Sequence, residues 1–335
     1  NEGNFSITNE NKTATGVGFN PSGTKMYVVG INGLGSNASI AQYSLSEPFN
    51  VSTSVLDENL VISAKESRPQ GIKFSADGLK VLVLGTTGDG VDVWDLTTPY
   101  DITTLTLANT THTSIGGNPR GFDFSNDGKK MFVLQLAELQ EYQLSTAFDP
   151  STKGTAKTLS ITAISSSIAQ GFAFNSDGKK MYVTRGKQQN SDSNSLNTIT
   201  EYDLTESFDI SSASSNGAYI SSYTDHEQIS GVTFNSTGSK LYYINFNAAD
   251  EVRQFSLSCS YGVVTCMDPT SDKDDVASVQ VQTAAAKEIM QHTTYPVLNR
   301  MEWLRRNKDN SNLTNQNVKL QFSNDDVVGT GAAQL

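Results

Sequence analysis

The chain has 335 residues, of which 36% are hydrophobic and 18% charged, and its net charge at pH 7 is −11. This length suits one large domain with an accessory segment. An acidic surface repels phosphate backbones, so nucleic acid is excluded as an expected partner. No stretch reaches about 18 consecutive apolar residues, the least that a membrane-spanning helix needs, so we expect no direct membrane insertion of this segment.

One phrase occurs five times along the chain. Its copies start at Gly16, Gly71, Gly121, Gly171 and Gly231 and read GVGFNPSGTKMYV, GIKFSADGLKVLV, GFDFSNDGKKMFV, GFAFNSDGKKMYV and GVTFNSTGSKLYY. A recurrence every 40 to 50 residues or so, built from short strands, is typical of β-propellers. The repeats therefore predict an all-β fold, a five-bladed β-propeller over residues 1–258.

Each repeat is expected to form four strands. The first is the GxxF segment, and the Asp or Ser before Gly that follows it favours a tight hairpin into a second, KMYV-like strand. The third strand carries an aromatic residue two positions before a leucine. A connector follows, and we expect its own aromatic residue to plug the edge of the blade: Phe49, Tyr100, Phe148 or Phe208. Fourth strands are predicted at NLVIS, LTLA, LSIT and AYISS.

The fifth repeat lacks a fourth strand, because its pattern ends at Phe255-Ser256-Leu257. The N-terminal Phe5-Ser6-Ile7-Thr8 precedes the first GxxF segment as a fourth strand should. We therefore expect this N-terminal strand to complete the last blade. Closure matters because an open ring would expose strand edges and an apolar blade face. The alternative is an open arc or a piece of a longer array.

The segment FNSDGKKMYVTR, Phe174 to Arg185, resembles the repeat of the YVTN-type β-propellers, which are common in secreted and surface-layer proteins. The resemblance covers residues 5 to 257. It implies the same fold and an extracellular or cell-surface location. It implies no particular activity, because propellers carry many unrelated functions.

Two sets of loops vary among the repeats, whereas the turns between first and second strands are nearly identical. The variable loops join second to third strands and lead into each repeat's glycine, so both sets lie at one end of a propeller. Variable loops on a rigid scaffold are where recognition usually resides. The candidate ligand-binding residues of this inner funnel are Arg68, Gln70, Arg120, Gln170, Asp225, His226 and Gln228. Ordinary solvated loops are the alternative for each of them.

The sequence shows no catalytic motif. None of its three histidines lies in HExxH, and no GxSxG segment occurs. In Asp225-His226-Glu227 the histidine could act as a base, but a hydrogen-bonded loop histidine is the simpler interpretation. We therefore predict no catalytic residues, no metal and no cofactor. Lys73 and Asp123, on neighbouring first strands, are expected to form a structural ion pair near the channel.

After Leu257 the pattern ends. Residues 259–275 form a predicted linker with a Cys259–Cys266 disulfide, which would imply export, and two unreactive free thiols are the alternative. The carboxylates of Asp268, Asp272, Asp274 and Asp275 lack the spacing of a calcium loop and suit the start of a helix better. Residues 276–309 have helical periodicity and propensity and predict a helical tether. Residues 310–335 form a polar tail.

The stretch from Thr283 to Asn324, TAAAKEIMQHTTYPVLNRMEWLRRNKDNSNLTNQNVKLQFSN, resembles the junction that precedes the outer-membrane barrel of some Gram-negative autotransporters. In that family a helix threads the barrel and tethers an exported passenger. No strands of barrel type occur before Leu335, so the resemblance leaves open whether a barrel follows.

The leading functional hypothesis is an exported, cell-surface propeller that binds a protein or glycan non-covalently through its variable loop face. One alternative is a lactonase-like or lyase-like enzyme that uses the central funnel with a bound metal. Another is a structural surface-layer or filament subunit that self-associates through the C-terminal helix.

Overall fold

The computed structural model describes residues 3–11, 13–32, 37–161, 168–186, 197–221, 228–246 and 250–263. All of them belong to the first of the two units into which the chain divides, Asn1–Ser271. The predicted tether, the polar tail, the acidic stretch Asp268–Asp275 and Cys266 lie outside the described residues, so the helix and the disulfide stay predictions. No helix in the described ranges is long and apolar enough to cross a membrane.

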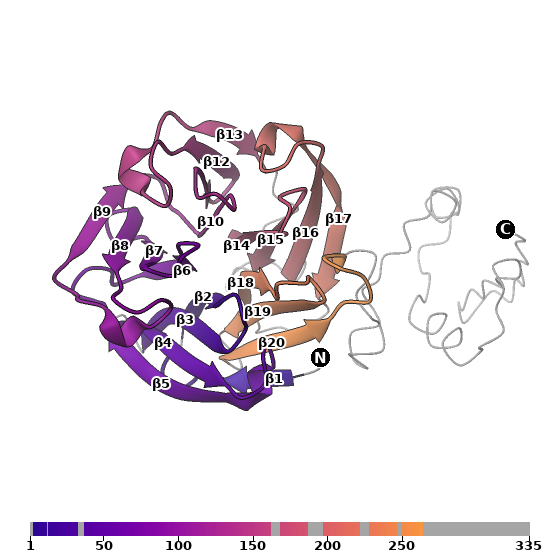
Figure 1. The fold of residues 1–335 in the computed structure, drawn as a ribbon. Coiled ribbons are helices and arrows are strands. Elements are labelled where there is room, and N and C mark those ends of the chain that lie inside the picture. Colours follow the sequence, from indigo (N-terminus) through magenta and orange to yellow (C-terminus); the bar gives the residue numbers. More distant parts are fainter. Residues whose placement is uncertain are drawn as a thin grey trace, which may run out of the picture. The chain divides into compact units, whose positions relative to one another are not determined.

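The described residues form five four-stranded antiparallel sheets, arranged as blades around a common centre (Figure 1). Blade 1 contains β2 (Thr13–Phe19), β3 (Lys25–Asn32), β4 (Asn37–Leu45) and β5 (Ser54–Val61). Blade 2 contains β6 (Pro69–Phe74), β7 (Lys80–Gly85), β8 (Gly90–Asp95) and β9 (Thr110–Ser114). Blade 3 contains β10 (Gly121–Phe124), β11 (Lys130–Leu134), β12 (Glu138–Gln143) and β13 (Lys157–Ser160).

Blade 4 contains β14 (Ile168–Phe174), β15 (Lys180–Gly186), β16 (Asn197–Leu204) and β17 (Ala213–Ser221). Blade 5 contains β18 (Gln228–Phe234), β19 (Lys240–Phe246), β20 (Glu251–Ser256) and β1 (Gly3–Ser6). The innermost strands contact one another in the cyclic order β2, β6, β10, β14, β18 and back to β2. The predicted five-bladed, four-stranded propeller is therefore confirmed.

The N-terminal strand closes the last blade, as predicted. β1 pairs antiparallel with β20, and Phe5 lies opposite Val252. The strand ends earlier than the predicted Phe5–Thr8, because Ile7 turns inward: it is fully buried, and its N–H donates to the carbonyl of Asp250 at 2.9 Å. The two ends of the propeller are thus joined by backbone hydrogen bonds.

The fourth strand of blade 2 differs from the prediction. We expected it at LTLA, residues 105–108, but the edge strand is β9, which begins at Thr110. Leu105 and Leu107 instead pack against the core between blades 1 and 2, and a turn follows in which the N–H of Asn109 donates to the carbonyl of Thr106 at 3.0 Å. The two leucines are apolar because the connector buries them, not because they alternate along a strand.

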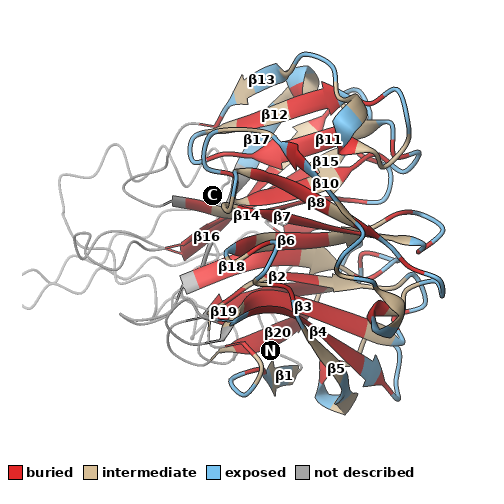
Figure 2. Ribbon diagram, turned by 90° about the vertical axis from the view of Figure 1, so that its left-hand side faces the viewer, coloured by how far each residue is buried: buried red, intermediate tan, exposed pale blue. Residues whose placement is uncertain are grey.

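The core of the propeller lies between the blades, as the buried faces in Figure 2 show. One cluster of buried side chains fills each of the five interfaces. The cluster between blades 5 and 1 contains Ile7 together with Val28 and Ile244. Since this interface is as well filled as the others, the ring is sealed by apolar packing as well as by strand pairing.

Each connector aromatic packs against a glycine in the turn between the first and second strands of its blade, and not at the blade edge where we expected it. Phe49 has a φ of 59°, an unusual conformation for a bulky residue. Its N–H donates to the carbonyl of Gly23 at 2.9 Å, and its ring fills the place that a Cβ on Gly23 would take. The same pair recurs in the other four blades as Gly78–Tyr100, Gly128–Phe148, Gly178–Phe208 and Gly238–Tyr261.

The fifth pair extends the propeller beyond the predicted boundary at residue 258. Tyr261 packs against Gly238 in the constant turn of blade 5. Val263 is fully buried, and its N–H donates to a carboxylate oxygen of Glu201 at 2.9 Å. The repeat pattern of the sequence did not predict this connector, because Cys259 and Gly262 occupy positions where the other repeats have different residues. Cys259 therefore lies on the edge of the last blade.

The same kind of bond links neighbouring blades around the ring. A Gln or Glu of the third strand accepts from the N–H of the residue two positions after the next blade's connector aromatic: Gln42 from Ile102, Glu141 from Ile210, Glu201 from Val263 and Gln254 from Val51. At the remaining interface Pro150 has no N–H to donate, and the third strand carries Val93, which has no acceptor. Donor and acceptor are therefore lost together.

This matching predicts an energetic coupling. Gln42→Val leaves the buried N–H of Ile102 without its acceptor and is expected to cost about 1–3 kcal/mol of unfolding free energy. Ile102→Pro in the Gln42→Val background removes the orphaned donor, so the double-mutant cycle should show a coupling of roughly 1 kcal/mol that favours the pair. Urea unfolding of the wild type, the two single variants and the double variant measures this coupling. Additive changes in unfolding free energy would show that Gln42 and the N–H of Ile102 are not coupled.

Candidate functional site

The five innermost strands narrow the central channel to a waist of glycines. A Cβ on Gly16 would lie 2.7 Å from the Cα of Gly71, and one on Gly171 would lie 2.8 Å from the nitrogen of Gly231. A Cβ on Gly231 would in turn lie 2.9 Å from the Cα of Gly16. Only about 20 Å³ remains open at this level. The waist therefore separates the loop end of the channel from the end that carries the constant turns.

On the loop side of the waist the strands carry β-bulges. Thr15, Gln70 and Gln170 are the extra residues in β2, β6 and β14, each immediately before its waist glycine. Bulges of this kind re-aim a side chain. Gln70 lines the waist itself, and Gln170 is half-buried. The structure thus brings these two predicted residues to the innermost part of the funnel.

The loop that carries Arg68 is clamped by a buried carboxylate. Glu66 is fully buried, and its carboxylate accepts from the N–H of Arg68 at 2.5 Å and of Thr87 at 3.3 Å. Gly85 makes room for it, because a Cβ there would lie 2.0 Å from the carboxyl group. Burial raises the pKa of Glu66, whereas these hydrogen bonds oppose the shift. The side chain of Arg68 is exposed, so a fixed loop presents it to solvent.

An amide clamps the loop that carries Arg120. The side chain of Gln135 accepts from the N–H of Asn118 at 2.7 Å and donates to the carbonyl of Gly116 at 3.1 Å. The N–H of Arg120 donates to the carbonyl of Leu134 at 2.8 Å. The guanidinium is half-buried, which lowers the pKa of Arg120, and its Nε has no hydrogen-bond partner among the described residues.

The other predicted funnel residues are not placed together by the structure. Asp225 and His226 lie outside the described residues, as does the side chain of Gln228, whose backbone begins β18 opposite Phe246. Arg68, Gln70, Arg120 and Gln170 remain as the placed part of the predicted site. Arg68 and Arg120 precede β6 and β10, two innermost strands that contact each other.

Sequence reasoning missed the clamps and a titratable pair beside them. Asp92 on β8 is buried and lies 3.1 Å from Nδ1 of His112 on β9. Burial raises the pKa of Asp92, and His112 opposes the shift. Glycines at positions 85 and 117 were the available signals for the clamps, since each leaves space for a neighbouring side chain. In the described ranges no group of three or more His, Cys, Asp or Glu residues could hold a metal ion.

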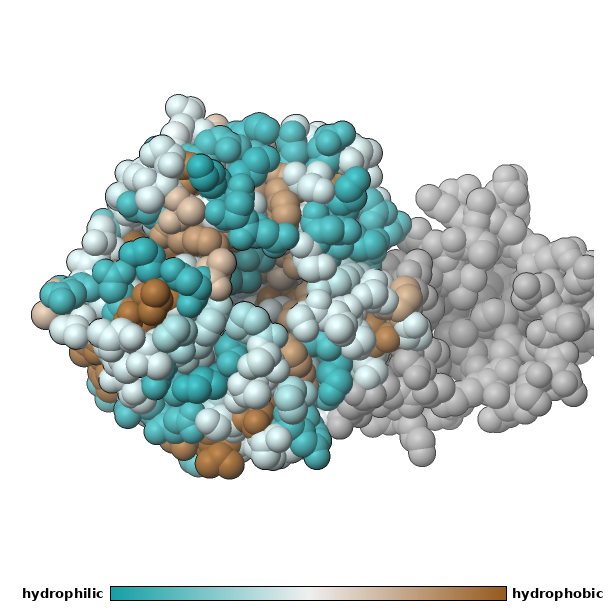
Figure 3. All heavy atoms as spheres, in the orientation of Figure 1, coloured by the Kyte–Doolittle hydropathy of each residue, from teal (hydrophilic) through white to brown (hydrophobic). Residues whose placement is uncertain are grey.

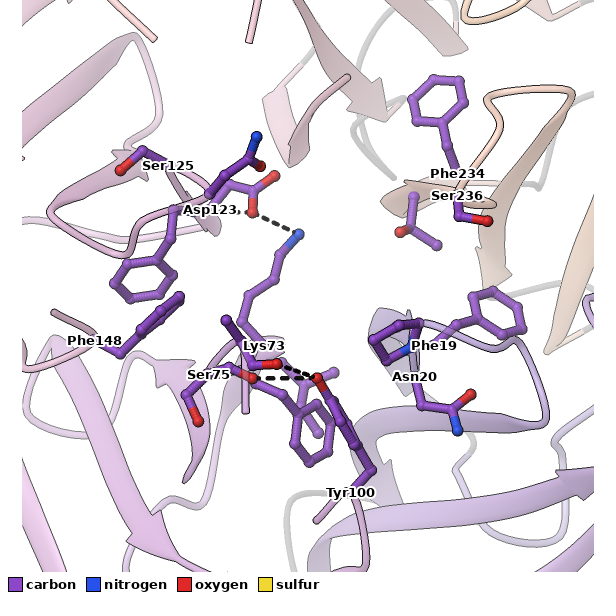
Figure 4. A pocket seen from close by; sticks show the side chains of 18 of the residues that line it. Phe19, Asn20, Lys73, Ser75, Tyr100, Asp123, Ser125, Phe148, Phe234 and Ser236 are labelled. Carbon is purple, nitrogen blue, oxygen red and sulfur yellow. Dashed lines mark hydrogen bonds and ion pairs between the residues drawn. The ribbon is translucent and has the colours of Figure 1, made fainter. Parts of the chain in front are cut away.

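The other end of the channel opens into a cavity of about 420 Å³. Figure 3 shows this end, where the constant turns lie, hollowed at its centre. Lys73 and Asp123 line the cavity, and their Nζ and Oδ1 atoms are 2.9 Å apart (Figure 4). The predicted ion pair is therefore confirmed. The cavity itself was not predicted, because the phenylalanines that line it have the sequence pattern of core residues.

The fold and the channel define the class of the protein: a closed five-bladed β-propeller with two channel mouths separated by a glycine waist. No protein-family model matches the chain, and no curated protein is significantly similar to it in sequence.

Three of the similar structures are propellers of different kinds. A protein of Bacteroides uniformis provisionally named a 6-phosphogluconolactonase has 14% identity and a TM-score of 0.44, over 75% of this chain and 70% of its own. The periplasmic gluconolactonase of Pseudomonas aeruginosa has 15% identity and a TM-score of 0.42, over 73% and 66%. A chain of the nidogen–laminin complex has 14% identity and a TM-score of 0.45, over 77% and 79%. Similarity at this level concerns the fold alone.

Proposed function

We propose that this propeller is an exported recognition module that binds an anionic group of a protein or glycan ligand, non-covalently, at its loop end. The observation that carries the proposal is the pair of clamped arginines. Glu66 and Gln135 hold the loops that carry Arg68 and Arg120, and these loops lead into β6 and β10, two innermost strands that contact each other.

Two features make an anion the fitting ligand. Guanidinium groups pair with carboxylates and phosphates through two parallel hydrogen bonds, and the side chain of Arg68 is exposed while that of Arg120 is half-buried. The chain as a whole carries a net charge of −11. The two arginines add positive charge at one mouth of an otherwise acidic protein. This positive charge would favour negative ligand groups and give the funnel its selectivity.

Location and assembly belong to the same proposal. The resemblance of Thr283–Asn324 to an autotransporter junction supports export to the cell surface, with residues 276–309 as a helical tether, and the predicted Cys259–Cys266 disulfide is compatible with this route. Self-association through that helix is the structural-subunit alternative, and light scattering with and without residues 276–335 distinguishes it. The enzymatic alternative, a metal-dependent lactonase or lyase, predicts stoichiometric metal in the purified protein.

The arginine pair gives the test. In a screen of acidic glycans and acidic proteins, a ligand of the wild-type chain should lose about 10- to 100-fold in affinity on Arg68→Gln or Arg120→Gln, because each removes a charged hydrogen bond worth roughly 1.5–3 kcal/mol. Lys129→Gln removes an exposed charge from a constant turn and is the matched control, expected to have no effect. Surface plasmon resonance at two salt concentrations measures both.

A ligand whose binding is unchanged in both arginine variants and insensitive to salt would contradict the proposal. If the chain bound only neutral ligands in the screen, the preference for anions would be wrong. The role proposed for the two clamped arginines would then be wrong as well.

A further inference from the structure

The cavity at the constant-turn end is not used by the loop-end proposal, since the glycine waist lies between them. It is nevertheless a built site: Lys73 is 24% and Asp123 14% exposed, so both charged groups reach the cavity although they are mostly shielded from bulk water. Its volume of about 420 Å³ is in the usual range for small-molecule pockets, roughly 300–1,000 Å³.

The carboxylate of Asp123 is fixed in place by three blades. Its Oδ1 accepts from the N–H of Phe124 at 2.9 Å and from Lys73, and its Oδ2 accepts from the N–H of Phe174 at 3.0 Å. A carboxylate offers about four acceptor positions, so Oδ2 retains one for a donor in the cavity. The anchoring by two backbone N–H groups means that the position of this acceptor is set by the fold.

The ammonium of Lys73 supplies the complementary donor. It has three N–H groups, and among the described residues Asp123 is the partner found for it. A ligand atom beside the pair can therefore accept from Lys73 and donate to Asp123 at once. A hydroxyl group does both, and two adjacent hydroxyls fit better than one. An anion would be attracted by Lys73 but repelled by Asp123. A cation would be attracted by Asp123 but repelled by Lys73.

The walls favour a ligand that also has an apolar face. Phe19, Phe74, Phe124 and Phe234 come from the equivalent position of four innermost strands and line the cavity. Across the cavity from the ion pair lie Phe234 and Ser236 of blade 5 (Figure 4). Phenyl rings beside hydroxyl-binding groups suit the C–H face of a ring that carries hydroxyls.

We propose that the constant-turn cavity binds a small neutral polyol, a monosaccharide or cyclitol, through Lys73 and Asp123. The site is independent of the loop end. It adds a second binding activity to the propeller, for a ligand small enough to enter one mouth of the channel without passing the waist.

Isothermal titration calorimetry on the full chain tests this with D-glucose, D-galactose, D-mannose and myo-inositol as probes, and with glucuronate and glucosamine as charged comparators. At least one neutral probe should bind better than either charged one. Lys73→Met, which keeps the apolar stem, and Asp123→Asn, which keeps an acceptor for one of the two backbone N–H groups, should each weaken binding at least tenfold. Lys80→Met, which removes the exposed pair with Asp95, is the matched control and should change affinity less than twofold.

Several outcomes would overturn the proposal. They are the absence of binding by every neutral probe at tens of millimolar, tighter binding of glucuronate or glucosamine, and unchanged affinity in a folded Lys73→Met protein. Circular dichroism establishes folding, so a misfolded Asp123→Asn protein leaves Lys73→Met to decide. Arg68→Gln and Arg120→Gln should leave polyol binding intact, so this site and the loop end fail or succeed separately.

Discussion

Deletion of residues 1–9 is expected to destabilise the whole propeller by about 5 kcal/mol or more, a large part of the roughly 5–15 kcal/mol that stabilises an ordinary domain. The deletion removes β1 and leaves β20 as an unpaired edge. It also removes Ile7, which is fully buried between blades 5 and 1, and Phe5, whose ring lies 5.1 Å from that of Tyr43. Truncating one buried isoleucine alone costs about 2–5 kcal/mol.

Calorimetric melting of the full chain and the deleted chain measures the effect. Thr8→Ala changes an exposed residue of the same segment and is the matched control, expected to leave the melting midpoint within a degree or so. A synthetic peptide of residues 1–9, added in excess, should restore part of the lost stability by binding the folded state. An unchanged midpoint after the deletion would show that blade 5 does not need its N-terminal strand.

Gly16→Ala is expected to destabilise the propeller by roughly 3 kcal/mol, the upper part of the usual range for overpacking. The added Cβ would lie 2.7 Å from the Cα of Gly71. Since both partners are backbone atoms of neighbouring blades, no side-chain rotation relieves the clash, and the two innermost strands must move apart. In a domain of this size each kcal/mol corresponds to about 2–4 °C in melting temperature.

Gly18→Ala is the matched control. It lies on the same strand, two residues further on, and its Cβ would meet nothing nearer than the carbonyl oxygen of Ile72 at 3.6 Å. We expect it to be close to neutral in thermal melting. If the two alanine variants melt alike, the waist is not held by close backbone packing, and the separation of the two mouths loses its physical basis.

The sequence predicts the repeating parts of this fold well, because every blade packs in the same way and therefore needs the same residue pattern. The five GxxF segments, the connector aromatics and the ring-closing strand follow from periodicity, and the Lys73–Asp123 pair follows from its position on neighbouring strands. Prediction fails where a residue departs from the repeat for a local reason. The alternation of Leu105 and Leu107 predicts a strand, but both residues lie in a buried connector. Tyr261 was not predicted as a connector aromatic, because its neighbours differ from those in the other repeats.

The candidate sites were less predictable, because they depend on side chains that no period relates. Glu66 and Gln135 clamp loops of different length through different groups, and only the folded structure brings each to its loop. The constant-turn cavity is formed by residues whose pattern reads as core, namely phenylalanines of the innermost strands. Variation among the loops indicates one end of the channel, whereas the nearly identical turns at the other end give no sign of a site.

The pairing of β1 with β20 has a consequence for how the chain matures. Strand β1 precedes its partner β20 by almost the whole length of the propeller, so during synthesis it stays unpaired until residues 251–256 have been made. Strand β20 also stays an unpaired edge until β1 docks, and a chaperone or a neighbouring chain that bound either strand would delay or divert this final step. The slowest phase of refolding should therefore be the docking of β1, and two chains that exchange this strand would form a linked dimer.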